Sequence, residues 1–264
     1  MNRIPLWKLS ASQQANSNPS KSSQPELVSE GILSRSESRG LSFAVFTPLH
    51  YERNYAYPLV VWLHGPDDSE QQLARIMPLV SLRNYVAMAP RGTAAGASNP
   101  TAFCWQQSEE HIAAAEGRVL ECLAISRQRF NVSLGRVFLA GHGCGGTMAL
   151  RLALRNPDYF AGVLSFGGRF PKGHAPLVRL NAARRLAIFL SCSRASRRYT
   201  TEMFCDDLRL IHAAGVPAIT VCQYPGDDGL RPRMLTDMDR WLMEQITGGG
   251  GVLAAAVSSQ GEPN

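Results

Sequence analysis

A glycine-dense turn in the middle of this 264-residue chain gives the clearest link between residue type and chemistry. Residues 137–150 read Val-Phe-Leu-Ala-Gly-His-Gly-Cys-Gly-Gly-Thr-Met-Ala-Leu, which predicts a strand, a tight turn and a helix. In a G-x-S-x-G turn the central serine is a nucleophile in a strained backbone conformation, and the glycines let strand and helix approach closely. Gly141 and Gly145 take the glycine positions here, and the central residue is Gly143. Because glycine has no side chain, an acyl-enzyme cannot form there.

Cys144 and His142 flank Gly143 and are the other reactive side chains of the turn. Cys144 would begin the helix, and a helix N-terminus lowers the pKa of a thiol, so a rearranged site centred on Cys144 remains an alternative. The simpler interpretation is a small packing residue, one position too late to be the nucleophile. His142 is a poor candidate for its base, because adjacent side chains on such a turn point apart.

Phosphate and metal sites also use glycine and histidine. The lysine of a P-loop is absent, and the run from Gly141 to Gly146 is not followed by a ribose-binding acid at the distance that dinucleotide-binding turns require. His50, His111 and His174 show no metal-ligand spacing. We therefore expect neither a metal nor a cofactor.

The elements that would position this turn are short apolar runs separated by amphipathic segments. We expect strands at residues 41–48, 59–63, 85–90, 137–140, 161–166, 186–191 and 218–224, and helices at 69–83, 108–130, 201–214 and 231–246. Uninterrupted apolar strands predict a mostly parallel central sheet with helices on both faces. The stretch between Gly168 and Leu186 is short, so no cap domain is expected.

A series of short motifs runs in order between residues 41 and 246. They are His64-Gly65, Ala89-Pro90-Arg91-Gly92, Phe103-Cys104-Trp105, Asn156-Pro157, Tyr224-Pro225-Gly226 and Trp241-Leu242. With the turn at Gly143, they resemble the phospholipase/carboxylesterase group of the α/β-hydrolases, which includes acyl-protein thioesterases. The resemblance implies an α/β-hydrolase fold and a Ser-Asp-His triad in that chain order.

The resemblance places the acid after the penultimate strand and the base after the last strand. Ser196 stands at the acid position and Asp228 at the base position. No Asp or Glu lies between Leu186 and Thr201, and no histidine follows His212, so a small shift in alignment restores neither group. Since the loss of one triad member already lowers the rate by orders of magnitude, ordinary hydrolysis is not expected.

The oxyanion-loop positions implied by the same resemblance are His64, Gly65, Pro66 and Cys144. The backbone N–H of Cys144 can serve as one donor. The other donor would come from the residue after H-G, which is Pro66 and has no N–H. His64 is expected to be the structural histidine of this turn.

Charged residues crowd the loops after the last two strands. Arg194, Arg197 and Arg198 surround Ser196, and Asp227 precedes Asp228. Because these strands are expected to be neighbours, we predict an ion-pair cluster over Gly143 in which at least one arginine pairs with one of the acids. An anion-binding pocket is the alternative.

Composition sets the wider limits. The net charge of +6 is mild for this length and gives little reason to expect a nucleic-acid partner. The six cysteines form no C-x-x-C pair, and the chain shows neither a signal peptide nor a membrane-length apolar run, so we expect a cytoplasmic protein. Polar and glycine-rich ends predict a disordered tail at 1–25, one domain at 26–247 and a flexible tail at 248–264.

The function expected from these observations is that of a catalytically inactive homologue of carboxylesterase- and phospholipase-type hydrolases. Such a protein would bind an unidentified small ligand or protein through the pocket mouth. The alternatives are an ester or thioester hydrolase rearranged around Cys144, and a binder of anionic ligands or nucleic acid.

Overall fold

The computed structural model describes residues 34–38, 41–95 and 102–257, with the backbone alone for 34–38 and 249–257. The disordered tail expected at residues 1–25 lies outside this part of the chain. Within it, the strands and helices alternate as the sequence predicts.

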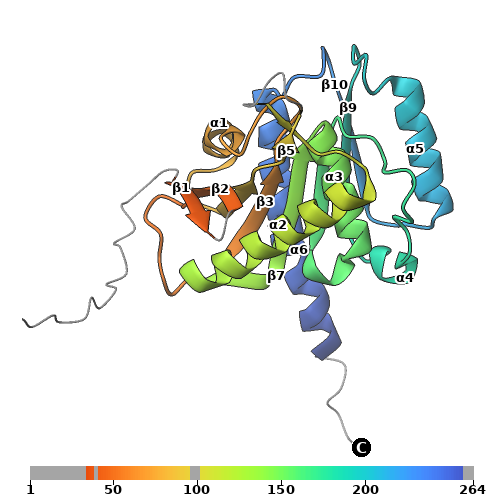
Figure 1. Ribbon diagram of the computed structural model, residues 1–264. Helices are drawn as coiled ribbons and strands as arrows, with labels where there is room; N and C mark the ends of the chain where they lie inside the picture. Colours follow the sequence, from red (N-terminus) through yellow and green to blue (C-terminus); the bar gives the residue numbers. More distant parts are fainter. Residues whose placement is uncertain (1–33, 39–40, 96–101, 258–264) are drawn as a thin grey trace, which may run out of the picture.

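An eight-stranded sheet forms the centre of the fold (Figure 1). Its spatial order is β1-β2-β4-β3-β7-β8-β9-β10. The first two pairings in this order are antiparallel and all the others are parallel. The strands are β1 (Ser34–Ser38), β2 (Leu41–Phe46), β3 (Tyr57–Leu63), β4 (Val86–Pro90), β7 (Val132–His142), β8 (Gly162–Phe166), β9 (Ala187–Ser193) and β10 (Ile219–Tyr224). A separate pair, β5 (Thr93–Ala94) with β6 (Phe103–Cys104), lies in the connection after β4.

Helices cover both faces of the sheet, as Figure 1 shows for α2 and α3 in front and α6 behind. They are α1 (Gln72–Val80), α2 (Glu109–Arg129), α3 (Cys144–Arg155), α4 (Leu180–Ala183), α5 (Thr201–Ala213) and α6 (Pro232–Val257), with a short 3₁₀ turn at Pro157–Tyr159. One apolar cluster packs α2, α3 and α5 on one face, and a second packs α1 and α6 on the other.

Strand β3 explains why both faces are apolar. Leu59, Val61 and Leu63 point into the first cluster, and Val60 and Trp62 into the second. All five are fully buried, because successive side chains of a strand point to opposite faces and helices cover each face. The continuous apolar run that predicted this strand is therefore the signature of a doubly covered sheet.

Two boundaries differ from the sequence prediction. Helix α6 runs to Val257 through four glycines, past residue 247, the end predicted for the domain. The alanines at 254–256 are strong helix formers, whereas the four glycines before them are weak ones. Strand β1 was not predicted, because Ser-Arg-Ser-Glu-Ser carries no apolar side chain and pairs only at the edge of the sheet.

The connection between β8 and β9 holds the four-residue helix α4 and no inserted cap. This connection therefore places no further domain over the carboxyl ends of the parallel strands. In the described part of the chain, no helix has the length and apolar character needed to cross a membrane.

Candidate functional site

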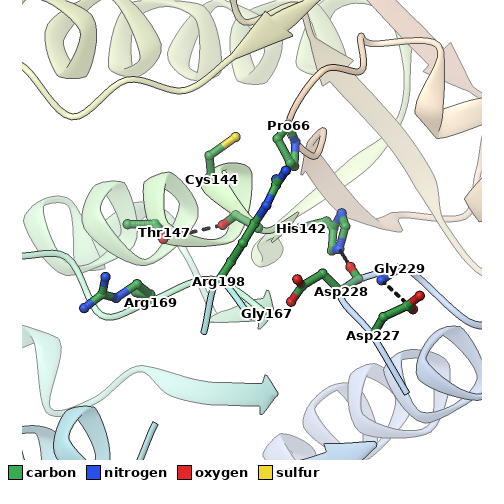
Figure 2. A pocket seen from close by; sticks show the side chains of 11 residues that line it. Pro66, His142, Cys144, Thr147, Gly167, Arg169, Arg198, Asp227, Asp228 and Gly229 are labelled. Atoms are coloured by element: carbon green, nitrogen blue, oxygen red, sulfur yellow. Dashed lines mark hydrogen bonds between the residues drawn. The ribbon is translucent and has the colours of Figure 1, made fainter. Parts of the chain in front are cut away.

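A cavity of about 530 Å³ opens at the carboxyl ends of the parallel strands (Figure 2). This is the edge at which ligands bind in open α/β sheets. Its lining comes from the first turn of α3 and from the ends of β3, β7, β8, β9 and β10. It consists of Pro66, His142, Gly143, Cys144, Thr147, Gly167, Arg169, Arg198, Asp227, Asp228 and Gly229.

Gly143 joins β7 to α3 in a backbone conformation that side chains rarely adopt, with φ +53° and ψ −119°. Its N–H donates to the carbonyl of Phe166 at 2.8 Å, which fixes the turn to the neighbouring strand. A Cβ at Gly145 would lie 2.3 Å from the carbonyl oxygens of Leu63 and His64, so only glycine fits there. The turn has the strained geometry of a nucleophile turn, but its central residue has no side chain.

Pro66 closes the space directly above this turn. A Cβ placed on Gly143 would lie 3.0 Å from Cδ of Pro66. The proline ring thus occupies the surroundings of a nucleophile, and it supplies no N–H for an oxyanion. The N–H of Cys144, at the first position of α3, has no partner within the helix and is the remaining candidate donor.

His64 is a structural histidine, buried at the end of β3. Its Nδ1 bonds to the carbonyl of Gly65 at 2.8 Å, and its Nε2 accepts the N–H of Gly92 at 3.0 Å. Burial lowers the pKa of His64, which keeps it in the neutral form that these bonds require. It joins the H-G turn to the turn after β4 and is not one of the residues that line the cavity.

His142 also serves to hold turns together. Its Nε2 donates to the carbonyl of Asp228 at 2.7 Å, while its buried Nδ1 has no hydrogen-bond partner and faces Gly65. Burial lowers the pKa of His142, so the imidazole is neutral. The side chain therefore points from the Gly143 turn to the loop after β10, as Figure 2 shows.

Ser196 and Asp228, which the sequence places at the acid and base positions, contact one another. The Ser196 hydroxyl donates to the Asp228 carboxylate and accepts the N–H of Tyr199 at 2.8 Å. The pair cannot act as the acid and the base of a triad. A hydroxyl stands where the acid would be, and a carboxylate stands where the imidazole would be. The loops after β9 and β10 meet as they would in a triad, but they carry a serine and an aspartate in place of an aspartate and a histidine.

Among the described residues, none of the three predicted arginines forms an ion pair with Asp227 or Asp228, so the expected cluster is not found. Asp227 pairs with Arg231 at 2.9 Å, four residues along the same loop, and Asp228 is engaged by Ser196. Arg194 donates to the side-chain oxygen of Gln223 at 3.1 Å, and Arg197 makes no ion pair with either acid. The sequence places opposite charges in neighbouring loops at one edge of the sheet. It does not show that Arg231 bonds Asp227 and that Ser196 bonds Asp228.

Hydrogen bonding makes Asp227 a stronger acid than usual. The N–H of Gly229 and the guanidinium of Arg231 both bond its carboxylate and hold its pKa below the ordinary value. Its charge is therefore constant across the neutral range.

Cys144 lines the cavity, but its thiol is not activated. Burial raises the pKa of Cys144, whereas the sequence argument expected the start of α3 to lower it. Desolvation of the thiolate outweighs the helix dipole at this position. The arrangement lacks the acidic thiol that a cysteine nucleophile needs.

Three residues of the site were not predicted from the sequence. Arg169 follows β8 and lines the cavity. Asp207 is buried on α5, where its Oδ2 accepts the Phe170 N–H and the Tyr199 hydroxyl, each at 2.8 Å. Arg151, buried on α3, donates to the carbonyls of Lys172 and Gly173, each at 2.8 Å. The signal for Asp207 was present, because it lies on the apolar stripe of its helix between Phe204 and Ile211.

The central position of the turn carries no side chain, and in the described residues His142 bonds the Asp228 carbonyl and not the Cys144 thiol. In the residues described, no group of three or more His, Cys, Asp or Glu side chains is placed to hold a metal ion. What the cavity offers is positive charge from Arg169 and Arg198, with acids that are already engaged.

Comparisons with known proteins agree with this geometry. The family described as "Putative esterase" matches residues 34–176, more than half of the chain. Arabidopsis thaliana SOBER1 is similar in structure, with a TM-score of 0.61 and 19% identity over 72% of this chain and 100% of that one.

Two further solved structures are similar at lower identity. Zea mays acyl-protein thioesterase 2 has a TM-score of 0.63 and 16% identity, covering 77% of this chain and 98% of that one. The Bacillus cereus carboxylesterase has a TM-score of 0.60 and 13% identity, covering 78% and 94%. No curated protein matches the chain in sequence. At these identities the structural likeness shows the fold.

Proposed function

Because the chain belongs to this esterase family and has the α/β-hydrolase fold of the phospholipase/carboxylesterase type, we propose that it is a non-catalytic member that binds a ligand. The binding site is the cavity above Gly143, and the partner is a small molecule or a protein segment that enters it. The protein binds this ligand in the cavity and does not convert it.

The observation that carries this proposal is the strained turn at Gly143. The backbone takes the nucleophile conformation, and the residue has no nucleophilic atom. Hydrolysis by acyl transfer requires a bond from such an atom to the substrate carbonyl. The Ser196–Asp228 contact supports the same interpretation, since the loops of a triad meet without an imidazole.

A second candidate function is thioester or ester hydrolysis by Cys144, favoured by the position of this residue in the cavity lining. Against it stands the raised pKa of the thiol, which leaves little thiolate near neutral pH. The orientation of His142 also counts against it, because its Nε2 is committed to the Asp228 carbonyl.

The test is a turnover assay with p-nitrophenyl acetate, p-nitrophenyl butyrate and a butyryl thioester, on the full chain and on Cys144→Ala. We expect both proteins to match the buffer rate. Turnover that Cys144→Ala abolishes would establish the second candidate. Turnover that survives this substitution and is blocked by a fluorophosphonate would place a serine nucleophile elsewhere and overturn both.

The organisation proposed with this function is one domain over residues 26–247 with a polar segment before it. A reducing compartment such as the cytoplasm suits the six cysteines, all of which are free thiols. The fold requires none of them to pair.

A further inference from the structure

We propose that the cavity takes a small organic anion, whose carboxylate or phosphate head binds on the side lined by Arg169 and Arg198. This inference rests on the binding function proposed above and names its ligand class. Both side chains line the cavity. In Figure 2, Arg198 extends toward Pro66, and the guanidinium group of Arg169 lies on the other side from the two acids.

The charges of the lining carry the argument. Asp227 is neutralised by Arg231 at 2.9 Å, and Asp228 accepts the Ser196 hydroxyl. In the described part of the chain, neither Arg169 nor Arg198 makes an ion pair or a side-chain hydrogen bond. The cavity thus presents two guanidinium groups without partners, and guanidinium groups match carboxylate and phosphate oxygens with paired hydrogen bonds.

The loops that carry the two arginines are tied to one buried carboxylate. Asp207 is 3% exposed and bonds both the N–H of Phe170, next to Arg169, and the hydroxyl of Tyr199, next to Arg198. Arg151 anchors the carbonyls of Lys172 and Gly173 on the same loop as Arg169. Both arginine side chains are exposed, so these contacts fix the backbone from which they extend and lower that part of the entropic cost of binding.

The remaining lining suits the rest of such a ligand. The cavity volume of about 530 Å³ lies within the range of small-molecule sites. Pro66, Cys144 and Gly167 give apolar surface for a short carbon chain. The Asp228 carboxylate would repel an anion on its own side, so the charged head is placed toward Arg169 and Arg198.

Isothermal titration of the full chain with sodium butyrate, inorganic phosphate and uncharged butyramide tests this inference. We expect at least one anion to bind and butyramide to bind at least tenfold more weakly. Arg169→Gln and Arg198→Gln should each weaken the anion about tenfold, the effect of losing one charge-assisted hydrogen bond. The two anion arms separate a carboxylate ligand from a phosphate ligand.

Arg197→Gln is the matched control, because all three arginines are exposed and Arg197 alone lies outside the cavity lining. It should leave the anion affinity unchanged. An equal loss in Arg197→Gln would mean that general surface charge binds the anion. No effect of Arg169→Gln and Arg198→Gln, or no binding of either anion, would overturn the inference.

The outcomes separate this inference from the proposed function. Butyramide binding as tightly as butyrate would leave a binding cavity and remove the anion preference. Hydrolysis of butyrate esters would contradict the non-catalytic function, whereas the effect of the arginine substitutions on anion binding would still be interpretable.

Discussion

The turn at Gly143 and the loops after β9 and β10 face one another across the cavity, and they are built in different ways. The turn is held by backbone contacts so close that a Cβ at Gly141 would lie 2.5 Å from the Gly145 carbonyl group. The loops are held by side chains, namely the Ser196–Asp228 contact, the Asp227–Arg231 pair and the His142 bond to Asp228.

This difference separates the form of a catalytic site from its chemistry. Backbone packing between β3, β7 and α3 dictates the shape of the turn, whether or not a nucleophile stands in it. Loop side chains have no such constraint and can exchange a histidine base for an aspartate without disturbing the sheet. A strained turn is therefore evidence of the fold, whereas the loop side chains decide the function.

The largest expected effect is that of Gly145→Ala, which disrupts the backbone packing of the Gly143 turn. Its Cβ would overlap the carbonyls of Leu63 and His64, which are backbone atoms and cannot rotate away. We expect a loss of about 3 kcal/mol or more in the free energy of unfolding, measured by urea denaturation.

Gly117→Ala is the control for this substitution, because nothing lies within 4 Å of its Cβ position on α2. It should stabilise the protein by about 0.5–1 kcal/mol through helix propensity. Equal stability of Gly145→Ala and the parent protein would show that β3 and α3 are not in close contact.

A smaller effect is expected on the loop side from Asp207→Ala. The substitution leaves the Phe170 N–H and the Tyr199 hydroxyl buried without an acceptor, at a cost of about 2–3 kcal/mol. Asp206→Ala, on the exposed side of the same turn, should change stability by less than about 0.5 kcal/mol. If the two variants unfold alike in urea, the two arginine loops do not share an anchor.

Gly143→Ser puts a nucleophilic atom into the turn and should still give no turnover. No base is placed to accept the serine proton, and the new Cβ meets Pro66 at 3.0 Å with φ at +53°. We expect a stability loss of about 1–2 kcal/mol. Ser196→Asp and Asp228→His are needed as well, and Pro66→Gly would add the second donor. Hydrolysis of p-nitrophenyl butyrate by the single variant would reveal a base that the account lacks.

A further effect concerns pH, and it accumulates gradually as the pH falls. Burial lowers the pKa of both His64 and His142 from an ordinary value of 6.5, so the unfolded chain binds protons more readily than the folded one. Stability is therefore fully present above about pH 6.5 and falls as the pH drops below it, by up to about 1.4 kcal/mol per pH unit for each histidine. Urea unfolding between pH 8 and 5 measures the slope, and His142→Gln should reduce it. A slope that His142→Gln leaves unchanged would mean that His142 titrates normally.

The sequence predicted the sheet and its helices well because the strands are buried on both faces. Runs such as Leu59–Leu63 have no other stable place in a protein of this size, and Gly143 follows such a strand at the spacing of a nucleophile turn. Pro66 was also identified, because the absence of an N–H is a property of the residue and needs no coordinates.

The partners of charged loop residues could not be predicted in the same way. Asp227 and Arg231 are four residues apart in the sequence, and their pairing depends on a loop conformation that no periodicity specifies. The pKa of Cys144 depends on the balance between burial and the helix dipole, and only the structure shows how deeply the thiol is buried. Asp207 was passed over because its partners come from two other loops.

The central claim, that no covalent acyl transfer takes place at Gly143, is tested most directly by mass spectrometry of the intact chain after incubation with p-nitrophenyl butyrate and, separately, with a fluorophosphonate. The account predicts an unchanged mass in both cases, for the parent protein and for Cys144→Ala alike. A gain of one butyryl or phosphonyl group, mapped to a peptide within residues 137–150, would contradict it.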